Sequence, residues 1–133
     1  MMTAIEILKT YALTTPIFLG IDLLWLGVIA KNFYQEKLGP MLRDPVNWPP
    51  AIIFYLLFPL GVIILAVSPA KEAESLQKAL FLGALFGFYT YATYDLSNLA
   101  TLKNWPLQVT ITDIIWGTFI STVTAGVAYL ITS

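Results

Sequence analysis

Four long apolar stretches divide the chain, and short polar segments separate them. They cover residues 5–30, 50–68, 76–96 and 107–131. A helix needs about 20 apolar residues, at 1.5 Å of rise each, to cross the hydrocarbon core of a bilayer. The pattern therefore predicts an all-α fold, a membrane bundle of four transmembrane helices that forms a single integral membrane domain over residues 1–133, with helix ends defined to about 2–4 residues.

Composition agrees with this pattern. Hydrophobic residues make up 58% of the chain and charged residues 11%, with a mean hydropathy of +0.76, whereas soluble domains carry about 25% charged residues. The first apolar stretch is too long for a signal peptide, and Glu6 and Lys9 interrupt its start. Whatever the protein does, it does within the bundle or in the short connections.

Two missing residue types narrow the chemistry. The sequence has no Cys and no His, which excludes disulfides, thiolate catalysis, Cys-zinc sites and histidine-ligated haem. We expect no cofactor and no metal site, since only oxygen ligands could hold an ion. The net charge is −1 and the Lys and Arg residues are dispersed, so we expect no nucleic acid partner.

The connection over residues 31–49 is the longest, and loops of that length are often functional or interfacial. Its segment 33–42 is amphipathic, with Phe33, Tyr34, Leu38 and Leu42 expected to dip into the headgroup plane, either as an interfacial segment or as a lid. In the third stretch, small residues recur at four-residue spacing, which suits close packing within the bundle or a homodimer. These residues are Ala79, Gly83 and Gly87.

Three carboxylates interrupt the apolar stretches: Asp22, Asp95 and Asp113. Because four consecutive spans alternate in direction, the end of the first, the end of the third and the start of the fourth meet at one membrane face. Asp22 and Asp113 then lie roughly 9–12 Å below that face, with Asp95 slightly shallower. The topology predicts that the three acids meet in one pocket.

An Asp near the bilayer centre costs about 2.5–3.5 kcal/mol, so such residues usually face the bundle interior or a watered cavity. Three of them in one dry pocket cannot all ionise, because like charges and desolvation oppose it. We expect at least one of the three to be protonated at neutral pH, or a cation to lie among them. The alternative is that Asp22 and Asp113 each only bridge a neighbouring helix.

Aromatic and amide side chains occupy the same level of the bundle. Tyr91, Tyr94, Asp95 and Asn98 share one helix face by their spacing, and Tyr55 lies at this level on the second span. Each of Asp22 and Asp113 has a Trp three residues later. We expect Trp25 and Trp116 to wall the pocket, and Trp48 and Trp105 to belong to the interfacial belt.

Four segments together resemble a family of small bacterial four-span membrane proteins, a domain of unknown function. They are DLLWLG (22–27), FYLL (54–57), TYDLSNLATL (93–102) and DIIWGT (113–118). The resemblance covers nearly the whole chain, and the 93–102 segment is its most specific part. It implies the four-span architecture and a multi-pass protein of the bacterial inner membrane, and it names no reaction.

Three functions fit these patterns. The first is binding or processing of a small amphiphile or membrane lipid, with Asp113 and Asp95 as acid and base, Asp22 as their orienter, and Trp25, Trp116, Tyr55, Tyr91, Tyr94 and Asn98 as binding residues. The second is a proton- or cation-coupled small transporter that acts as a dimer. The third is an accessory subunit without chemistry, so whether the protein is an enzyme stays open.

Overall fold

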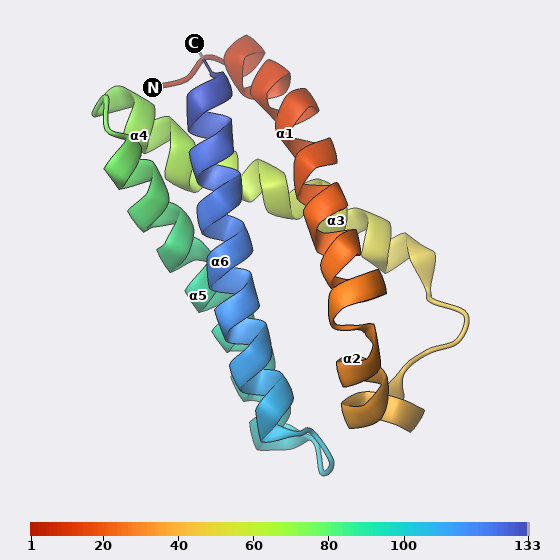
Figure 1. Ribbon diagram of the computed structural model, residues 1–133. Coiled ribbons are helices and arrows are strands. Elements are labelled where there is room, and N and C mark those ends of the chain that lie inside the picture. The colour runs from red at the N-terminus through yellow and green to blue at the C-terminus, as the bar shows by residue number, and fades with distance from the viewer. Residues whose placement is uncertain (133) are drawn as a thin grey trace.

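The structure, a computed structural model, describes residues 1–132, and every regular element in that range is a helix (Figure 1). The termini meet at one end of the molecule, and the connection between the last two helices lies at the other end. The elements, in chain order, are α1 (Ala4–Leu24), η1 (Trp25–Ile29), α2 (Lys31–Leu38), η2 (Gly39–Met41), α3 (Trp48–Val62), η3 (Ile63–Val67), α4 (Ser68–Glu72), α5 (Leu76–Thr101) and α6 (Leu107–Ile131).

Three helical rods are long and apolar enough to cross a membrane: Ala4–Ile29, Trp48–Glu72 and Leu107–Ile131. Large apolar side chains on their outer surfaces are exposed, as expected of residues that contact lipid. α5 has 26 residues, but the Tyr, Thr, Asp and Asn residues of its second half make it less apolar. The all-α membrane character is confirmed, and the count of four spans stays a prediction.

Local sequence explains where the helices begin. Thr3 and Glu6 form a capping box at the start of α1, in which the Thr3 hydroxyl accepts from the Glu6 amide at 3.2 Å and the Glu6 carboxylate accepts from the Thr3 amide at 3.0 Å. Ser75 caps α5 by accepting from the Lys78 amide at 3.0 Å. These caps satisfy amides that have no partner within their own helix.

The second span does not end at Ser68 and Pro69 as the sequence pattern predicts. The Ser68 amide donates to the carbonyl of Ile63, five residues earlier, so η3 is a π-helical turn that continues directly into α4. Such wide turns interrupt the usual ladder of hydrogen bonds, and Pro69, which lacks an amide donor, follows directly after this one. α5 likewise runs past the predicted end at residue 96 to Thr101.

α5 and α6 lie side by side and antiparallel, and glycines allow their backbones to approach. A Cβ atom at Gly83 would lie 2.6 Å from the Cβ of Ala125, and one at Gly87 would overlap the carbonyl oxygen of Gly117. The small-residue stripe of α5 therefore packs against α6 within the chain. Close packing in the bundle accounts for it without a second copy.

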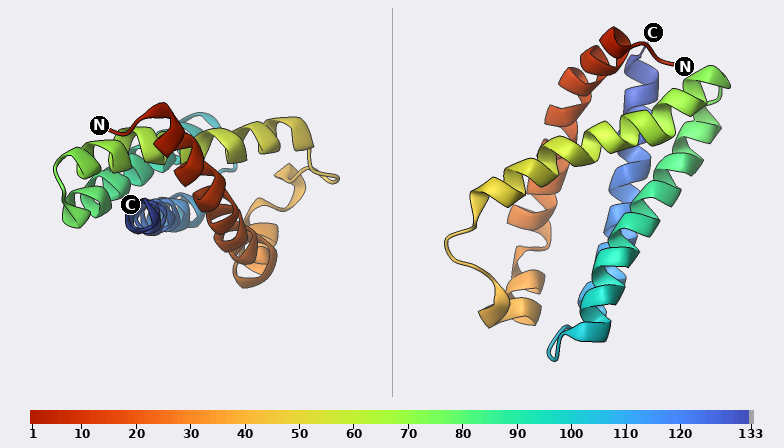
Figure 2. Two further views of the ribbon diagram at one scale, coloured as in Figure 1. Left: turned by 90° about the horizontal axis from the view of Figure 1, so that it is seen from above. Right: turned by 180° about the vertical axis from the view of Figure 1, so that it is seen from behind.

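The two ends of the bundle differ in packing. In the middle of the bundle, Phe18, Val62, Ile63 and Ile120 are completely buried between the helices, and Val67 and Ala70 are completely buried nearer the termini. Toward the other end, α3 runs obliquely away from the α5–α6 pair, and α2 lies below α1 (Figure 2). The splayed end is where a cavity forms.

Candidate acidic and aromatic cavity

A cavity of about 840 Å³ lies at the end of the bundle away from the termini. Every long helix contributes to its wall, as do α2 and the segment that follows it. The lining residues are Asp22, Leu26, Gly27, Lys31, Tyr34, Gln35, Leu38, Leu42, Val46, Ala51, Phe54, Tyr55, Phe58, Thr90, Tyr91, Tyr94, Trp105, Asp113 and Trp116.

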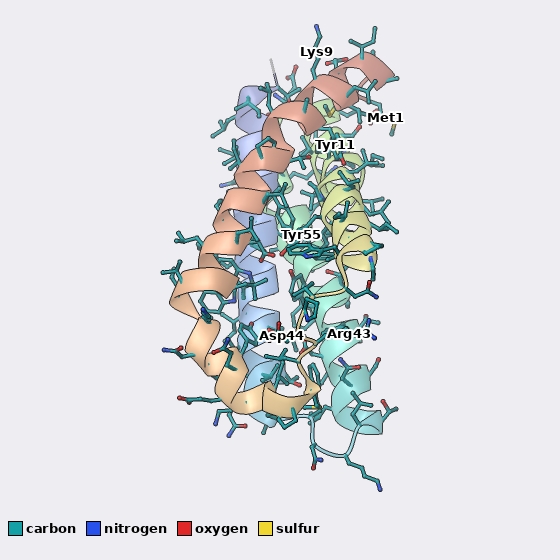
Figure 3. All side chains as sticks on the ribbon, turned by 90° about the vertical axis from the view of Figure 1, so that its right-hand side faces the viewer. Met1, Lys9, Tyr11, Arg43, Asp44 and Tyr55 are labelled. Carbon is teal, nitrogen blue, oxygen red and sulfur yellow. The ribbon has the colours of Figure 1, made fainter. Side chains whose placement is uncertain are left out.

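Asp22 connects α1 to α6 on one side of this cavity. Its side chain is only 3% exposed, and its Oδ1 accepts a hydrogen bond of 3.0 Å from the indole Nε1–H of Trp116. The hydroxyl of Tyr55, which Figure 3 shows between α1 and α3, lies beside the same carboxyl group. A buried carboxyl thus finds its donors on neighbouring helices.

The two tryptophans that follow the acids stack on each other. The rings of Trp25 and Trp116 lie 4.4 Å apart between centroids with an interplanar angle of 8°. Trp25 belongs to η1, and π-helical turns of this kind are frequent at functional sites. The stack joins α1 to α6 at the level of the Asp22 carboxyl.

Asp113 receives its hydrogen bond from α2. The hydroxyl of Tyr34 donates to Asp113 Oδ1 and accepts from the indole Nε1–H of Trp25 at 3.3 Å. Burial, and then the hydrogen bond to Asp113, raise the pKa of the Tyr34 phenol. Tyr34 is therefore a neutral donor at physiological pH, and it ties α2 to both α1 and α6.

Asp95 lies behind Asp113. It is completely buried on α5, and neither of its carboxyl oxygens has a hydrogen-bond partner among residues 1–132. The carboxyl group of Asp113 is a neighbour of the Asp95 carboxyl group across the α5–α6 contact. Two carboxylates are both acceptors, so a proton or another donor is needed to join them.

The structure brings most of the predicted residues together, either in the lining of the cavity or directly behind it. Asp22, Asp113, Trp116, Tyr55, Tyr91 and Tyr94 line the cavity. Asp95 lies behind Asp113, and Trp25 lies behind Trp116. Asn98 is not part of the lining, and it lies beside Tyr94 on α5.

Sequence reasoning did not assign Tyr34 or Trp105 to the cavity wall. Tyr34 and Leu38 are spaced by one helical turn on the amphipathic segment, and this side of α2 turns into the cavity. Trp105, which the sequence assigns to the interfacial belt, lines the cavity and donates from Nε1 to the hydroxyl of Thr110 at 3.1 Å. The amphipathic period of α2 was the available signal for Tyr34, whereas nothing in the local sequence marked Trp105.

The second span contributes more residues to the cavity wall than its uniformly apolar sequence indicates. Phe54 and Phe58 of α3 line the cavity together with Tyr55, and the ring of Phe58 stacks on that of Phe18 at 5.3 Å. Among residues 1–132, no group of three or more acids is arranged to hold a metal ion. The wall combines carboxyl and phenol groups with aromatic and aliphatic side chains.

A helical bundle with three membrane-length apolar rods and a cavity between its helices is a multi-pass membrane protein in architecture. The chain belongs to the family described as "Predicted membrane protein (DUF2177)", whose model matches residues 7–130. The match runs from α1 into the last turns of α6. Neither the curated proteins nor the solved structures contain a match to this chain.

Proposed function

We propose that this protein is a four-span domain of the bacterial inner membrane that binds a small amphiphile or lipid in the cavity. One observation carries the proposal: carboxyl groups from two helices and a wide apolar wall border the same space of about 840 Å³. Ligand sites in proteins have volumes of about 300–1,000 Å³, with mostly apolar walls and a few placed polar groups. A polar head at Asp22 and Asp113 and a chain along Leu26, Phe54 and Phe58 would fill it.

The α2 side of the cavity supports entry of such a ligand from the membrane surface. Lys31, Gln35, Leu42 and Val46 line the cavity and are also exposed, so the cavity reaches the surface beside α2. An amphiphile can enter there with its head toward the acids. The interfacial position predicted for this segment fits that route.

A cavity-filling variant tests binding. Ala51→Phe places a ring at a lining position, and Ile52→Phe adds the same ring at the neighbouring exposed position, which does not line the cavity. A photoreactive alkyl amphiphile in a phosphatidylcholine bilayer should label peptides of α1, α3 and α6 that border the cavity. Labelling should fall in Ala51→Phe and persist in Ile52→Phe; equal labelling of both variants would exclude cavity binding.

The fourth span of this proposal is α5. It has 26 residues, runs antiparallel to α6 and exposes Phe81, Phe88 and Leu96 on its outer side. Because the sequence has no Cys, single cysteines report topology cleanly. With α5 across the membrane, Glu74→Cys and Lys103→Cys should react with an impermeant maleimide from opposite sides, and reaction from the same side would remove the fourth span.

A second candidate is a proton- or cation-coupled transporter that acts as a dimer, and one observation favours it. Four buried hydroxyl groups of α1 and α6 have no hydrogen-bond partner among residues 1–132: those of Thr14, Thr15, Ser121 and Thr124. The fixed contacts of Asp22 with Trp116 and of Thr10 with Thr132 place Thr14, Thr15 and Thr124 at about the same level between the two helices. Such hydroxyls can lead water or ions away from the cavity.

The Asp113→Asn variant separates these candidates. In liposomes, a transporter should lose substrate-dependent proton movement with this change. An enzyme, in which Asp113 and Asp95 act as proton acceptor and donor and Asp22 orients them, should keep ligand binding and lose turnover. A binding protein without chemistry should show neither flux nor turnover in the unmodified chain.

A further inference from the structure

The acids of the cavity accept hydrogen bonds only from neutral groups among those the structure shows. Asp22 accepts from the Trp116 indole and Asp113 from the Tyr34 phenol. The basic residue of the lining, Lys31, is exposed at its edge. Buried carboxylates are usually balanced by a cation or by several donors, so this cavity has an excess of acceptors.

Asp95 is the acid with the fewest hydrogen bonds. Its side chain is completely buried, neither carboxyl oxygen has a hydrogen-bond partner among residues 1–132, and Asp113 at the cavity wall is its neighbour. An unpartnered buried carboxyl is costly, and the cost falls when a donor is supplied. Asp95 does not line the cavity, whereas Asp113 and Asp22 do, so a ligand group placed there can donate to Asp113 and Asp22.

We propose that the head group this cavity selects is a protonated primary amine on an apolar chain. This inference rests on the proposed binding function and names its ligand class. An ammonium group has a positive charge and three hydrogen-bond donors, and bonds between an ammonium and a carboxylate are about twice as strong as neutral ones. The apolar wall at Leu26, Phe54 and Phe58 accommodates the chain.

The aromatic residues favour a donating ammonium over a quaternary one. Quaternary ammonium groups bind to the open faces of aromatic rings. One face of Trp116 is covered by Trp25 at 4.4 Å, and Phe119 packs against the ring at 5.7 Å. The carboxyl oxygens of Asp95 lack a hydrogen-bond donor among residues 1–132, and a trimethylated nitrogen has no donor to offer.

Two sources share this chemistry, a free long-chain amine and the ethanolamine head of a phospholipid. The test uses the full chain in phosphatidylcholine nanodiscs, titrated with dodecylamine, dodecanol or dodecyltrimethylammonium and followed by tryptophan fluorescence. In a parallel arm, native mass spectrometry compares retention of phosphatidylethanolamine with that of phosphatidylcholine. The first arm reports a free amine and the second reports a lipid head group.

Dodecylamine should bind at least about tenfold more tightly than dodecanol or the trimethylated analogue, as expected for one added charge-assisted hydrogen bond. Asp113→Asn and Asp22→Asn should each reduce amine binding to the level of the alcohol. Asp44→Asn removes the same charge at an exposed position of the connection before α3 (Figure 3) that is not among the lining residues, and it should leave binding unchanged.

The outcomes separate this inference from the binding function. Equal binding of amine and alcohol, sensitive to Ala51→Phe, overturns the ammonium preference and keeps the amphiphile site. Equal binding of the trimethylated analogue also overturns it, because donors are then irrelevant. Absence of all binding removes both proposals. Circular dichroism verifies the fold of each variant, and if Asp113→Asn does not fold, Asp22→Asn decides the matter.

Discussion

At the end of the bundle that holds the termini, polar groups bind one another. The hydroxyls of Thr10 and Thr132 lie 2.7 Å apart, the Met2 amide donates to the Ser68 hydroxyl at 3.2 Å, and Lys71 donates to the Thr132 carbonyl. Lys71 also lies 4.1 Å over the ring of Tyr129. At the cavity end, by contrast, Asp95 has no hydrogen-bond partner within the described residues 1–132, and the hydrogen bonds to Asp22 and Asp113 come from neutral donors.

This difference separates stability from binding within one small bundle. The end near the termini is filled by completely buried apolar side chains such as Val67 and Ala70, and hydroxyl, amide and ammonium contacts within the chain close it. The cavity end leaves space and unused acceptors, and it is linked across α2 by the Tyr34 hydroxyl. Binding regions commonly lie in the less stable part of a protein. Four substitutions test whether the cavity end is the less stable part of this bundle.

The largest expected effect is at the core. Ile120→Ala removes a completely buried side chain and should lower the free energy of unfolding by about 2–5 kcal/mol. Leu26→Ala, at a cavity-lining position that is 41% exposed, should change it by about 0.5 kcal/mol or less. Unfolding in bicelles measures both free energies, and similar losses would mean that the core and the cavity wall are equally packed.

The α5–α6 contact comes next. Gly87→Ala places a methyl group against the Gly117 carbonyl and should cost about 1–3 kcal/mol of unfolding free energy. Gly20→Ala is the matched control, because a Cβ at Gly20 has no other atom within 4 Å. If both variants unfold alike, the close contact between these helices is not a source of stability.

The link between α2 and the bundle should have a smaller effect. Tyr34→Phe removes the donor to Asp113 and should cost about 0.5–1.5 kcal/mol, mostly as faster amide hydrogen exchange in α2. Because the pKa of Tyr34 is raised in the folded state, the unfolded phenol ionises first, and stability should fall with rising pH only above about pH 10. Unchanged exchange would show that α2 is held by other contacts.

The smallest effect belongs to a single hydroxyl pair. Thr10→Val removes the contact with Thr132 and should cost about 0.6 kcal/mol, the average for such bonds between membrane helices. Thr101→Val is the control, since its exposed hydroxyl bonds only to its own helix. If Thr10→Val lowered the free energy of unfolding by more than Tyr34→Phe does, the expected order of these two effects would be wrong.

The hydropathy pattern located part of the site because carboxyl groups in apolar stretches must avoid lipid. For Asp22 and Asp113, position in the chain was sufficient to expect a shared level of the bundle. Tyr34 could not be assigned to the site in this way, because whether α2 folds against the bundle depends on contacts with α1 and α6. Trp105 lies where an interfacial residue is ordinary, and only its packing turns it into the cavity.

By itself, the sequence determined the helical membrane character, the short amphipathic helix after the first span, and the depth of the acids along their helices. These follow from local hydropathy and helical period. Only the tertiary structure decided that Trp116 donates a hydrogen bond to Asp22, that Tyr34 donates one to Asp113, and that Asp95 has no donor among residues 1–132. Such pairings depend on how neighbouring helices are rotated and spaced, and close packing of the whole bundle sets both.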